Sequence, residues 1–287
     1  MKSVSVNTLN ARKGEFMKSV SVFVNAKNLD DCYFQLLSEL YKHGRKNHID
    51  SGSFAGSDRL EFDFAAGTIE FPTTRPLAPI MPEGIPPVTT DEKIEEYFTH
   101  YLMDGDNLEE HEDYRYSTWI HGGKYKLPYI EYRSNIRCLE DSYHRGGKNT
   151  GFIHDTNFYV RVPNQIQWAI DHYKKAGHGN NHGYLQIGYP ESSLAYDIPY
   201  ANETERQTSP CLRGIDTAIK DGVLHMSVTF RSWDLFSGFP ENMGGITLLG
   251  MFMSNELGIE MGPLSFACLK LHCYSHEIEA MKSRLKV

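Results

Sequence analysis

The chain has 287 residues, of which 40% are hydrophobic, so it can bury a sizeable core in one large domain or two small ones. Its formal net charge of −8 at pH 7 argues against nucleic acid or an anionic membrane surface as a partner, because both require a basic protein surface. No stretch approaches the roughly 18 apolar residues of a membrane helix, and the N-terminus lacks the apolar core of a signal peptide.

A short repeat marks the start of the chain: "MKSVSV" occurs at residues 1–6 and again at 17–22. Six residues are too few for a solenoid repeat, whose period is roughly 20 to 50 residues. We therefore predict that residues 1–16 are an N-terminal extension and that 17–287 form a single domain. Two similar strands at the edges of a sheet are the alternative interpretation.

The first predicted elements are a helix over residues 28–44 and two strands. Asn28 or Asp30 caps the helix and Gly44 ends it. Alternating apolar residues predict a strand at 59–64 and a second strand at 68–72. The residues that predict the apolar face of the helix are Phe34, Leu37, Leu40 and Tyr41.

The middle of the chain contains a proline-rich stretch and a long polar one. Six prolines in residues 72–87 predict a loop over one domain rather than a linker, because a helical pattern resumes at once in 89–102. The polar stretch 104–150 has no long periodic segment, which favours a functional loop. Residues 163–177 then predict a helix that covers a sheet, and 183–189 predict a strand.

Two strand-like runs then flank Asp221-Gly222, a dipeptide typical of hairpin turns. A two-residue loop pairs Cys211 with Ser232, whereas a three-residue loop pairs Cys211 with Arg231. In both registers Cys211 lies within about 5 to 8 Å of Arg231. Because a guanidinium stabilises a thiolate, we expect Arg231 to lower the pKa of Cys211 and to activate it as a nucleophile.

The five cysteines do not indicate a disulfide framework or a metal site. They form no CxxC pair and no zinc-like spacing, and their number is odd. We therefore expect a reducing, cytoplasmic environment and no bound metal. The five are Cys32, Cys138, Cys211, Cys268 and Cys273.

Three motifs follow the hairpin in a specific order. Arg-Ser-x-Asp occupies residues 231–234, Gly-x-Pro-x-Asn occupies 238–242, and His-x-Tyr-Ser occupies 272–275 after an apolar helix. With Cys211 after a proline, these motifs resemble the thymidylate synthase family, which includes pyrimidine nucleotide hydroxymethylases. The resemblance is strong over about residues 205–279 and weaker but collinear upstream. It implies an α+β fold whose large twisted mixed sheet is covered by helices and forms a homodimer through one face.

The resemblance also implies roles for the motif residues. Cys211 would attack C6 of a pyrimidine nucleotide, so that C5 takes a one-carbon unit from 5,10-methylenetetrahydrofolate. Arg231 and Ser232 would hold the phosphate. Asp234 would act in catalysis and, with Gly238, contact the folate.

Base and sugar recognition are assigned in the same way. Asn242 would read the pyrimidine edge, and its amide donor and acceptor favour uracil over cytosine. His272 and Tyr274 lie on one strand face and would contact the sugar hydroxyls. These residues fit ribose and deoxyribose equally.

Upstream, Glu95 or Glu96 is the candidate for the family's general base and Tyr116 for its proton-transfer tyrosine. Arg59, in preference to Arg75, is the candidate for a second phosphate contact.

The chain departs from the family in three places. Asn-Asn-His-Gly at 180–183 stands where synthases carry an arginine pair, so Arg206, Arg213 or His182 is expected to serve the phosphate. Leu212 replaces the usual histidine after the nucleophile, and Lys286 and Val287 end the chain without a clear closing segment.

Because exclusion of water decides between reduction and hydration of the transferred carbon, these departures favour hydroxymethylation. Reductive methylation of dUMP, hydroxymethylation of a cytidylate and a non-catalytic nucleotide- or folate-binding role are the alternatives.

Overall fold

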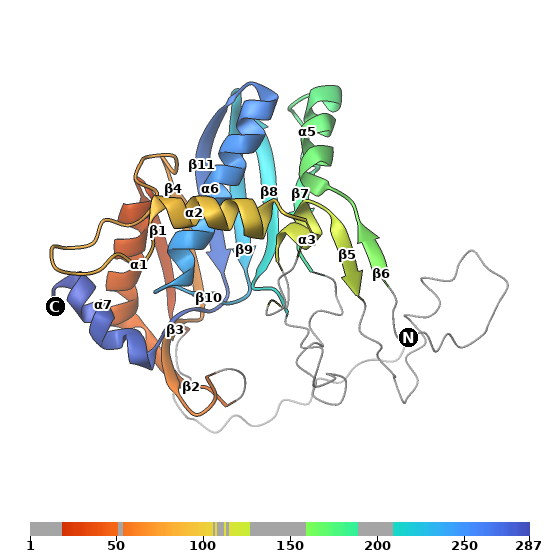
Figure 1. Ribbon diagram of the computed structural model, residues 1–287. Helices are drawn as coiled ribbons and strands as arrows, with labels where there is room; N and C mark the ends of the chain where they lie inside the picture. The colour runs from red at the N-terminus through yellow and green to blue at the C-terminus, as the bar shows by residue number, and fades with distance from the viewer. Residues whose placement is uncertain are drawn as a thin grey trace, which may run out of the picture.

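A six-stranded mixed sheet forms the centre of the molecule in the computed structural model, which describes residues 19–50, 54–105, 107, 112, 115–126, 159–188 and 209–287 (Figure 1). Two of its strand pairs are parallel (β1 with β4, β11 with β9) and the other three are antiparallel. In spatial order the strands are β1 (Ser21–Ala26), β4 (Phe64–Ile69), β11 (Glu260–Cys268), β9 (Val223–Phe230), β8 (Leu212–Lys220) and β7 (Gly183–Gln186).

Helices cover one face of this sheet. In Figure 1 the long apolar helix α6 (Gly238–Leu257) crosses in front of β9 and β11, with α1 (Leu29–His43) beside β1 and α5 (Gln165–Ala176) beside β7. The remaining helices are α2 (Asp91–Tyr97), which continues into the π-helical turn η1 (Phe98–Leu102), α3 (Ser117–Ile120), the 3-10 turn η4 (Ser275–Glu277) and α7 (Ile278–Leu285). The predicted α+β fold with a mixed sheet under helices is confirmed.

The burial of two adjacent rows of residues distinguishes the two faces of the sheet. One row runs across all six strands and is buried beneath the helices: Val24, Gly67, Phe266, Val228, Ile215 and Leu185. The next row points to the opposite face and is partly or fully exposed: Asn25, Thr68, Ser265, Ser227, Asp216 and Tyr184. Among the described residues, no helix or strand covers this second face.

A second sheet lies at one end of the first. Its order is β10 (Trp233–Asp234), β12 (Leu271–Tyr274), β3 (Asp58–Phe62) and β2 (Arg45–His48), and β5 (Gly123–Lys126) pairs separately with β6 (Tyr159–Val162). Strand β10 runs parallel to β12, so Asp234 pairs with His272. Two of the three family-like motifs thus meet in one pair of strands.

The helix predicted at 28–44 is α1, and Asn28 caps it by accepting the Asp31 N–H at 2.9 Å. Its predicted apolar face was partly wrong, because Tyr41 is 37% exposed whereas Tyr33 is fully buried. The reason is a tertiary contact: the Tyr33 hydroxyl donates to the Phe236 carbonyl at 3.0 Å, which turns this side of the helix inward.

The hairpin turn forms at Asp221-Gly222, as predicted. Both residues have positive φ (52° and 79°), which this turn requires and which glycine and aspartate adopt more readily than most residues. Lys220 pairs with Val223, so the loop has two residues.

The remaining predicted elements also have counterparts. The strands predicted at 59–64, 68–72 and 183–189 correspond to β3, β4 and β7, with shifted bounds, and the buried residues of α5 lie at the predicted helical spacing. Residues 72–87 contain no helix or strand, and the Ile80 N–H donates to Asp30 of α1 at 2.7 Å. The proline-rich stretch therefore packs on the helix layer.

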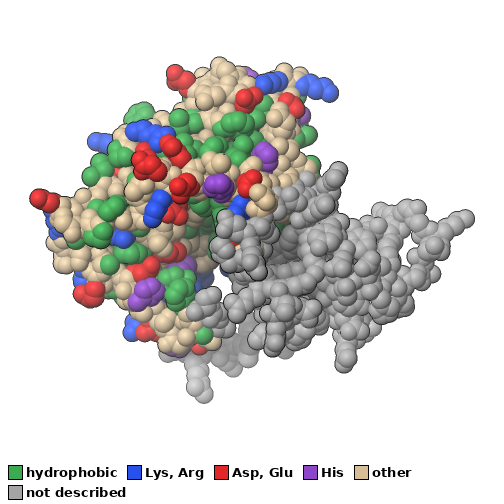
Figure 2. All heavy atoms as spheres, viewed as in Figure 1, with side chains coloured by type: hydrophobic (Ala, Val, Ile, Leu, Met, Phe, Trp, Pro, Cys, Tyr) green, Lys and Arg blue, Asp and Glu red, His purple; other side chains and the backbone are tan. Residues whose placement is uncertain are grey.

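Some predictions fall outside the described residues, namely the extension at 1–16, Arg206, Cys138 and most of 104–150. Within the described part, Cys32, Cys211, Cys268 and Cys273 are free, and no three histidine, cysteine or acidic side chains gather as a metal site would require. No helix among the described residues is long and apolar enough to span a bilayer. On the face drawn in Figure 2, acidic, basic and apolar side chains are interspersed.

Candidate active site

The hairpin brings Cys211 directly against Arg231. The pairing starts with the two-residue loop, but a bulge between Leu212 and Gly214 shifts the register, so that the Arg231 N–H donates to the Cys211 carbonyl at 2.9 Å. The Arg231 Nη2 lies 3.8 Å from the Cys211 Sγ. Both alternative registers thus occur along one hairpin, and the expected closeness of the two side chains is confirmed.

The expected effect on the thiol is only partly correct. Burial raises the pKa of Cys211 above its ordinary value, while Arg231 and then Arg213 act in the opposite direction. The prediction of a net lowered pKa is therefore wrong for the unliganded chain, because the loss of solvent around the sulfur outweighs the two guanidinium groups. Burial therefore favours the neutral form of the Cys211 thiol.

Two arginines converge on the segment before Cys211. Arg231 donates from Nη2 to the Ser209 carbonyl at 2.7 Å and from Nε to the Pro210 carbonyl at 3.1 Å. Arg213 donates from Nη2 to the Ser209 hydroxyl. Because Arg213 is the extra residue of the bulge, the irregularity of β8 is what places a second cation here.

His182, the other described candidate for a second cation, lies elsewhere. It precedes Gly183, which pairs with Thr217, whereas Gln186 pairs with Gly214 nearer to Cys211. Its Nδ1 lies 2.9 Å from the Nε2 of His172 on α5. The structure does not bring His182 to Cys211 within one chain.

Asn242 lies on the first turns of α6 and is held from two sides. The Trp233 indole Nε1–H donates to its Oδ1 at 2.9 Å, and its Nδ2 donates to the Tyr97 hydroxyl at 2.9 Å. Sequence reasoning missed Trp233 and Tyr97. Trp233 occupies the variable position of Arg-Ser-x-Asp, so the motif assigns it no role. Tyr97 directly follows Glu95 and Glu96, which were the candidates on this helix because of their carboxylates.

Aromatic rings connect Asn242 back to Cys211. Tyr97 stacks on Tyr101 at a centroid distance of 5.1 Å, and Tyr101 meets Tyr116 edge-on at 5.2 Å. The hydroxyl of the buried Tyr116 accepts the Leu212 N–H at 3.3 Å. The candidate residues therefore lie on one continuous path of contacts from the cysteine to the amide.

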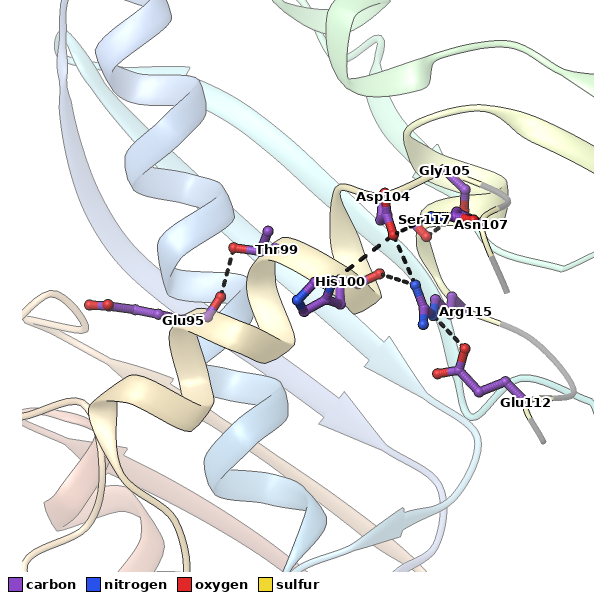
Figure 3. A network of polar contacts seen from close by, with 9 residues as sticks. All are labelled: Glu95, Thr99, His100, Asp104, Gly105, Asn107, Glu112, Arg115 and Ser117. Atoms are coloured by element: carbon purple, nitrogen blue, oxygen red, sulfur yellow. Dashed lines mark hydrogen bonds and ion pairs between the residues drawn. The ribbon is translucent and has the colours of Figure 1, made fainter. Parts of the chain in front are cut away.

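A buried arginine holds the segment that carries Tyr116 (Figure 3). Arg115 is 3% exposed and donates to Glu112 at 2.6 Å, to Asp104 at 3.1 Å and to the His100 carbonyl at 3.3 Å. Two carboxylates compensate the charge of this guanidinium, which a buried arginine requires. This network ties Tyr116 to the end of the π-helical turn η1.

The two candidate glutamates lie on the exposed side of α2. Glu95 is ion-paired with Arg75 at 3.4 Å, and in Figure 3 its side chain extends away from the Arg115 network. Arg75 also pairs with Asp91 at 2.8 Å. Among the described residues, α2 reaches the path through Tyr97 rather than through either glutamate.

Asp234 and His272 lie side by side at the motif junction. Asp234 accepts the Phe236 N–H at 2.9 Å and the Ser237 hydroxyl, which orders the turn that leads to Gly238. Burial lowers the pKa of His272, whose Nδ1 faces the Lys270 carbonyl at 3.0 Å. Its Nε2 is enclosed and has no hydrogen-bond partner among the described residues.

Tyr274 covers His272 and is itself half-buried. The two rings meet at 4.9 Å, and Tyr274 pairs in register with Arg59 on β3. Arg59 forms an ion pair with the buried Glu61 at 2.6 Å. Tyr274 therefore packs edge-on against the buried His272, with Arg59 opposite it on β3.

The buried Glu277 and the buried Arg284 contact the segments that carry Tyr274 and Asp234. Burial and the nearby Asp234 raise the pKa of Glu277 to about 7, and Glu277 accepts the Tyr274 N–H at 2.8 Å. Arg284 of α7 donates to the Phe236 carbonyl at 3.0 Å and lies 3.4 Å above the Phe236 ring. The loop after Asp234 is thus held by the last helix.

The site thus consists of a half-buried cysteine beside an arginine, joined through aromatic side chains to an amide that is held from two sides. Comparison with known proteins relates the chain to the thymidylate synthase family, whose model, described as thymidylate synthase, matches residues 193–287. The resemblance seen in the motifs is thereby confirmed.

Individual relatives extend this likeness along the chain. A protein named "Putative thymidylate synthase" from Methanosarcina mazei is 22% identical over 92% of this chain and 94% of its own length. Thymidylate synthase from Symbiobacterium thermophilum is 25% identical over 58% of this chain and 60% of its own length. Thermostable thymidylate synthase A from Bacillus subtilis has the same fold, with a TM-score of 0.56 over 90% of this chain and 84% of its own, at 14% identity.

Proposed function

We propose that this protein transfers a one-carbon unit from 5,10-methylenetetrahydrofolate to C5 of a uridylate-type nucleotide, with 5-hydroxymethylation as the preferred outcome. The observation that carries the proposal is the contact path from Cys211, beside Arg231, to the fixed amide of Asn242. The family relationship and the relatives named for thymidylate synthesis support it.

Cys211 is the proposed nucleophile. Its sulfur adds to C6 of the ring, and the electrons of the C5–C6 double bond make C5 nucleophilic. Burial favours the neutral thiol, which must lose its proton as it reacts, and the Arg231 Nη2 at 3.8 Å favours the thiolate. C5 then bonds to the methylene carbon of the folate.

Loss of the C5 proton and departure of tetrahydrofolate leave an exocyclic methylene group. Tyr116 is the proposed proton-transfer residue, since its hydroxyl touches the residue that follows Cys211. The general base is proposed to be Glu95 or Glu96; both lie on the exposed side of α2, and Glu95 is paired with Arg75. Addition of water and release of Cys211 give the hydroxymethyl product, whereas hydride from tetrahydrofolate gives a methyl group and dihydrofolate.

The phosphate is proposed to bind where Arg231 and Arg213 converge on Ser209, with Ser232 beside them. Two guanidinium groups at one segment form a strong site for a dianion. Arg231 and Arg213 would thus replace the arginine pair that synthases carry at 180–183, and His182 would not be needed for the phosphate. Arg59, engaged with Glu61, is a weaker candidate.

The other substrate groups are assigned to the second sheet. Tyr274, with His272 behind it, is proposed to meet the sugar hydroxyls, and Asp234 and Gly238 the folate. The departure from the synthases at Leu212, directly after Cys211, supports hydroxymethylation over reduction, because it alters the surroundings of the thiol, where exclusion of water decides the outcome. We further propose that the protein acts in the cytoplasm.

The open face of the large sheet is proposed to form a homodimer interface. Small or flat side chains such as Ala66, Ala267 and Ser227 lie across its central strands, which suits close packing against a second copy. The exposed Phe23 and Tyr184, on the two edge strands, add apolar area to the same face.

Mass spectrometry of products tests the function directly. UMP, dUMP, CMP and dCMP are each incubated with 5,10-methylenetetrahydrofolate and either the wild-type protein or Cys211→Ala. We expect a C5-hydroxymethyl product from a uridylate that is absent with Cys211→Ala. A methylated product with dihydrofolate would replace hydroxymethylation by reductive methylation, and no product from any nucleotide would favour a binding role.

A further inference from the structure

We propose that Trp233 determines the choice of base by locking the amide orientation of Asn242, so that the site accepts uracil and rejects cytosine. The inference rests on the proposed function and assigns a specificity role to a residue outside the reacting groups. Trp233 is a positioning residue, because it acts through Asn242.

The chemistry of the contact fixes which amide atom faces the indole. Trp233 Nε1–H is a donor only, so the Asn242 atom at 2.9 Å must be the acceptor Oδ1. The amide nitrogen then faces the Tyr97 hydroxyl at 2.9 Å. A tyrosine hydroxyl can donate or accept and therefore suits either amide orientation, whereas the indole suits one.

The indole itself is held rigidly. Trp233 is 2% exposed and stacks on Phe230 at a centroid distance of 3.8 Å with an interplanar angle of 6°. Phe239 packs on it at 4.8 Å, and Phe266 meets it edge-on at 6.0 Å. A ring packed on these sides cannot turn its N–H away from Asn242 without disturbing the core.

The locked amide has one acceptor position left on Oδ1 and one N–H left on Nδ2. Uracil presents an N3–H donor and an O4 acceptor, which match this pair. Cytosine presents an N3 acceptor and an N4 donor and needs the reversed amide. Reversal would set the Asn242 NH2 group against the buried Trp233 N–H, so that two donors face each other in a part-buried contact, which is costly.

The test compares Trp233→Phe with two matched variants. Phenylalanine retains a packed aromatic ring and removes the N–H. Tyr97→Phe removes the hydroxyl that accepts from the Asn242 amide. Trp168→Phe changes a tryptophan on α5 that is 48% exposed and serves as the control. For each protein, Kd and kcat/KM are measured for dUMP and dCMP, and for UMP and CMP, and thermal unfolding checks the fold.

We expect wild type to prefer the uridylate and Trp233→Phe to reduce that preference roughly tenfold or more, the amount typical of one unsatisfied buried donor. Tyr97→Phe should weaken binding of both bases with little change in their ratio, and Trp168→Phe should match wild type. An unchanged ratio in Trp233→Phe, with wild type still selective, would overturn the inference and leave the proposed function standing. A wild type that prefers cytidylate or does not discriminate would also overturn the inference.

Absence of binding and turnover with all four nucleotides would instead remove the proposed function, and the inference with it. If Trp233→Phe does not fold, nitrogen-15 NMR of the wild type replaces it. The chain has three tryptophans, so the indole region is simple. Trp119 and Trp233 are both 2% exposed, whereas Trp168 is 48% exposed. We expect two slowly exchanging indole N–H signals, of which the one that remains in Trp119→Phe shifts on addition of a uridylate; rapid exchange of that signal, or no shift, would overturn the inference.

Discussion

At the scale of single residues, two opposing effects act on the pKa of Cys211. Burial favours the neutral thiol, and the two arginines favour the thiolate. The three other described cysteines are fully buried, so Cys211 is the accessible thiol of the described part. The balance between these effects is measurable as reactivity against pH.

We predict that iodoacetamide alkylates Cys211 with an apparent pKa above the ordinary thiol value, so that the rate still rises above pH 9. Arg231→Gln should raise that pKa further and slow alkylation at pH 8 about fivefold, as expected for loss of an interaction of about 1 kcal/mol. The rate is followed by mass spectrometry in a Cys138→Ala background, with Cys211→Ala as the blank. Faster alkylation in Arg231→Gln would contradict the contact.

At the scale of elements, the packing of α2 on α6 decides where Tyr97 and Asn242 lie. A Cβ at Gly245 would fall 2.4 Å from Cδ1 of Tyr97, and one at Gly244 would fall 2.7 Å from Cγ2 of Ile94. These glycines therefore let the two helices approach closely, and the close approach places the Tyr97 hydroxyl at the amide of Asn242.

We predict that Gly245→Ala lowers the free energy of unfolding by roughly 1 to 3 kcal/mol through overpacking. Helix propensity alone predicts the opposite sign, a gain of up to about 1 kcal/mol. Gly250→Ala is the matched control in the same helix, since its nearest neighbours are the flexible ends of Met226 and Met261, which can move. Urea denaturation measures both, and a stabilised Gly245→Ala would refute the packing argument.

Local patterns predicted most elements because each depends on nearby residues. The cap at Asn28, the Asp221-Gly222 turn and the spacing of Ile166, Ile170 and Tyr173 all act over a few positions. The inward side of α1 was less well predicted, because the Tyr33 contact with Phe236 joins residues 203 positions apart. The bulge at Arg213 was not predicted either, since both hairpin registers were compatible with the sequence.

At the scale of the whole molecule, the open sheet face is the main surface without a covering layer in the described chain. Ser227 lies near its centre on β9 and is exposed. An arginine there would place a charge and a long side chain inside an interface formed by this face, where small residues allow close contact.

We predict that wild type is a dimer of the 32.8 kDa chain and that Ser227→Arg shifts it to monomer. Ser283→Arg, an equal change at an exposed position of α7, should leave the dimer intact. Size-exclusion chromatography with light scattering reads the mass. A monomeric wild type, or a dimeric Ser227→Arg, would contradict the proposed interface.

The sequence by itself determined the hairpin that sets Cys211 against Arg231 and the motifs that relate the chain to thymidylate synthases, because both depend on local spacing and on short-range turn chemistry. The class of fold followed from the resemblance that those motifs carry. Only the tertiary structure decided that burial outweighs Arg231 at the thiol, that Arg213 joins Arg231 at Ser209, and that Trp233 and Tyr97 hold Asn242. Burial and hydrogen bonding between distant segments arise from packing, which no local pattern specifies.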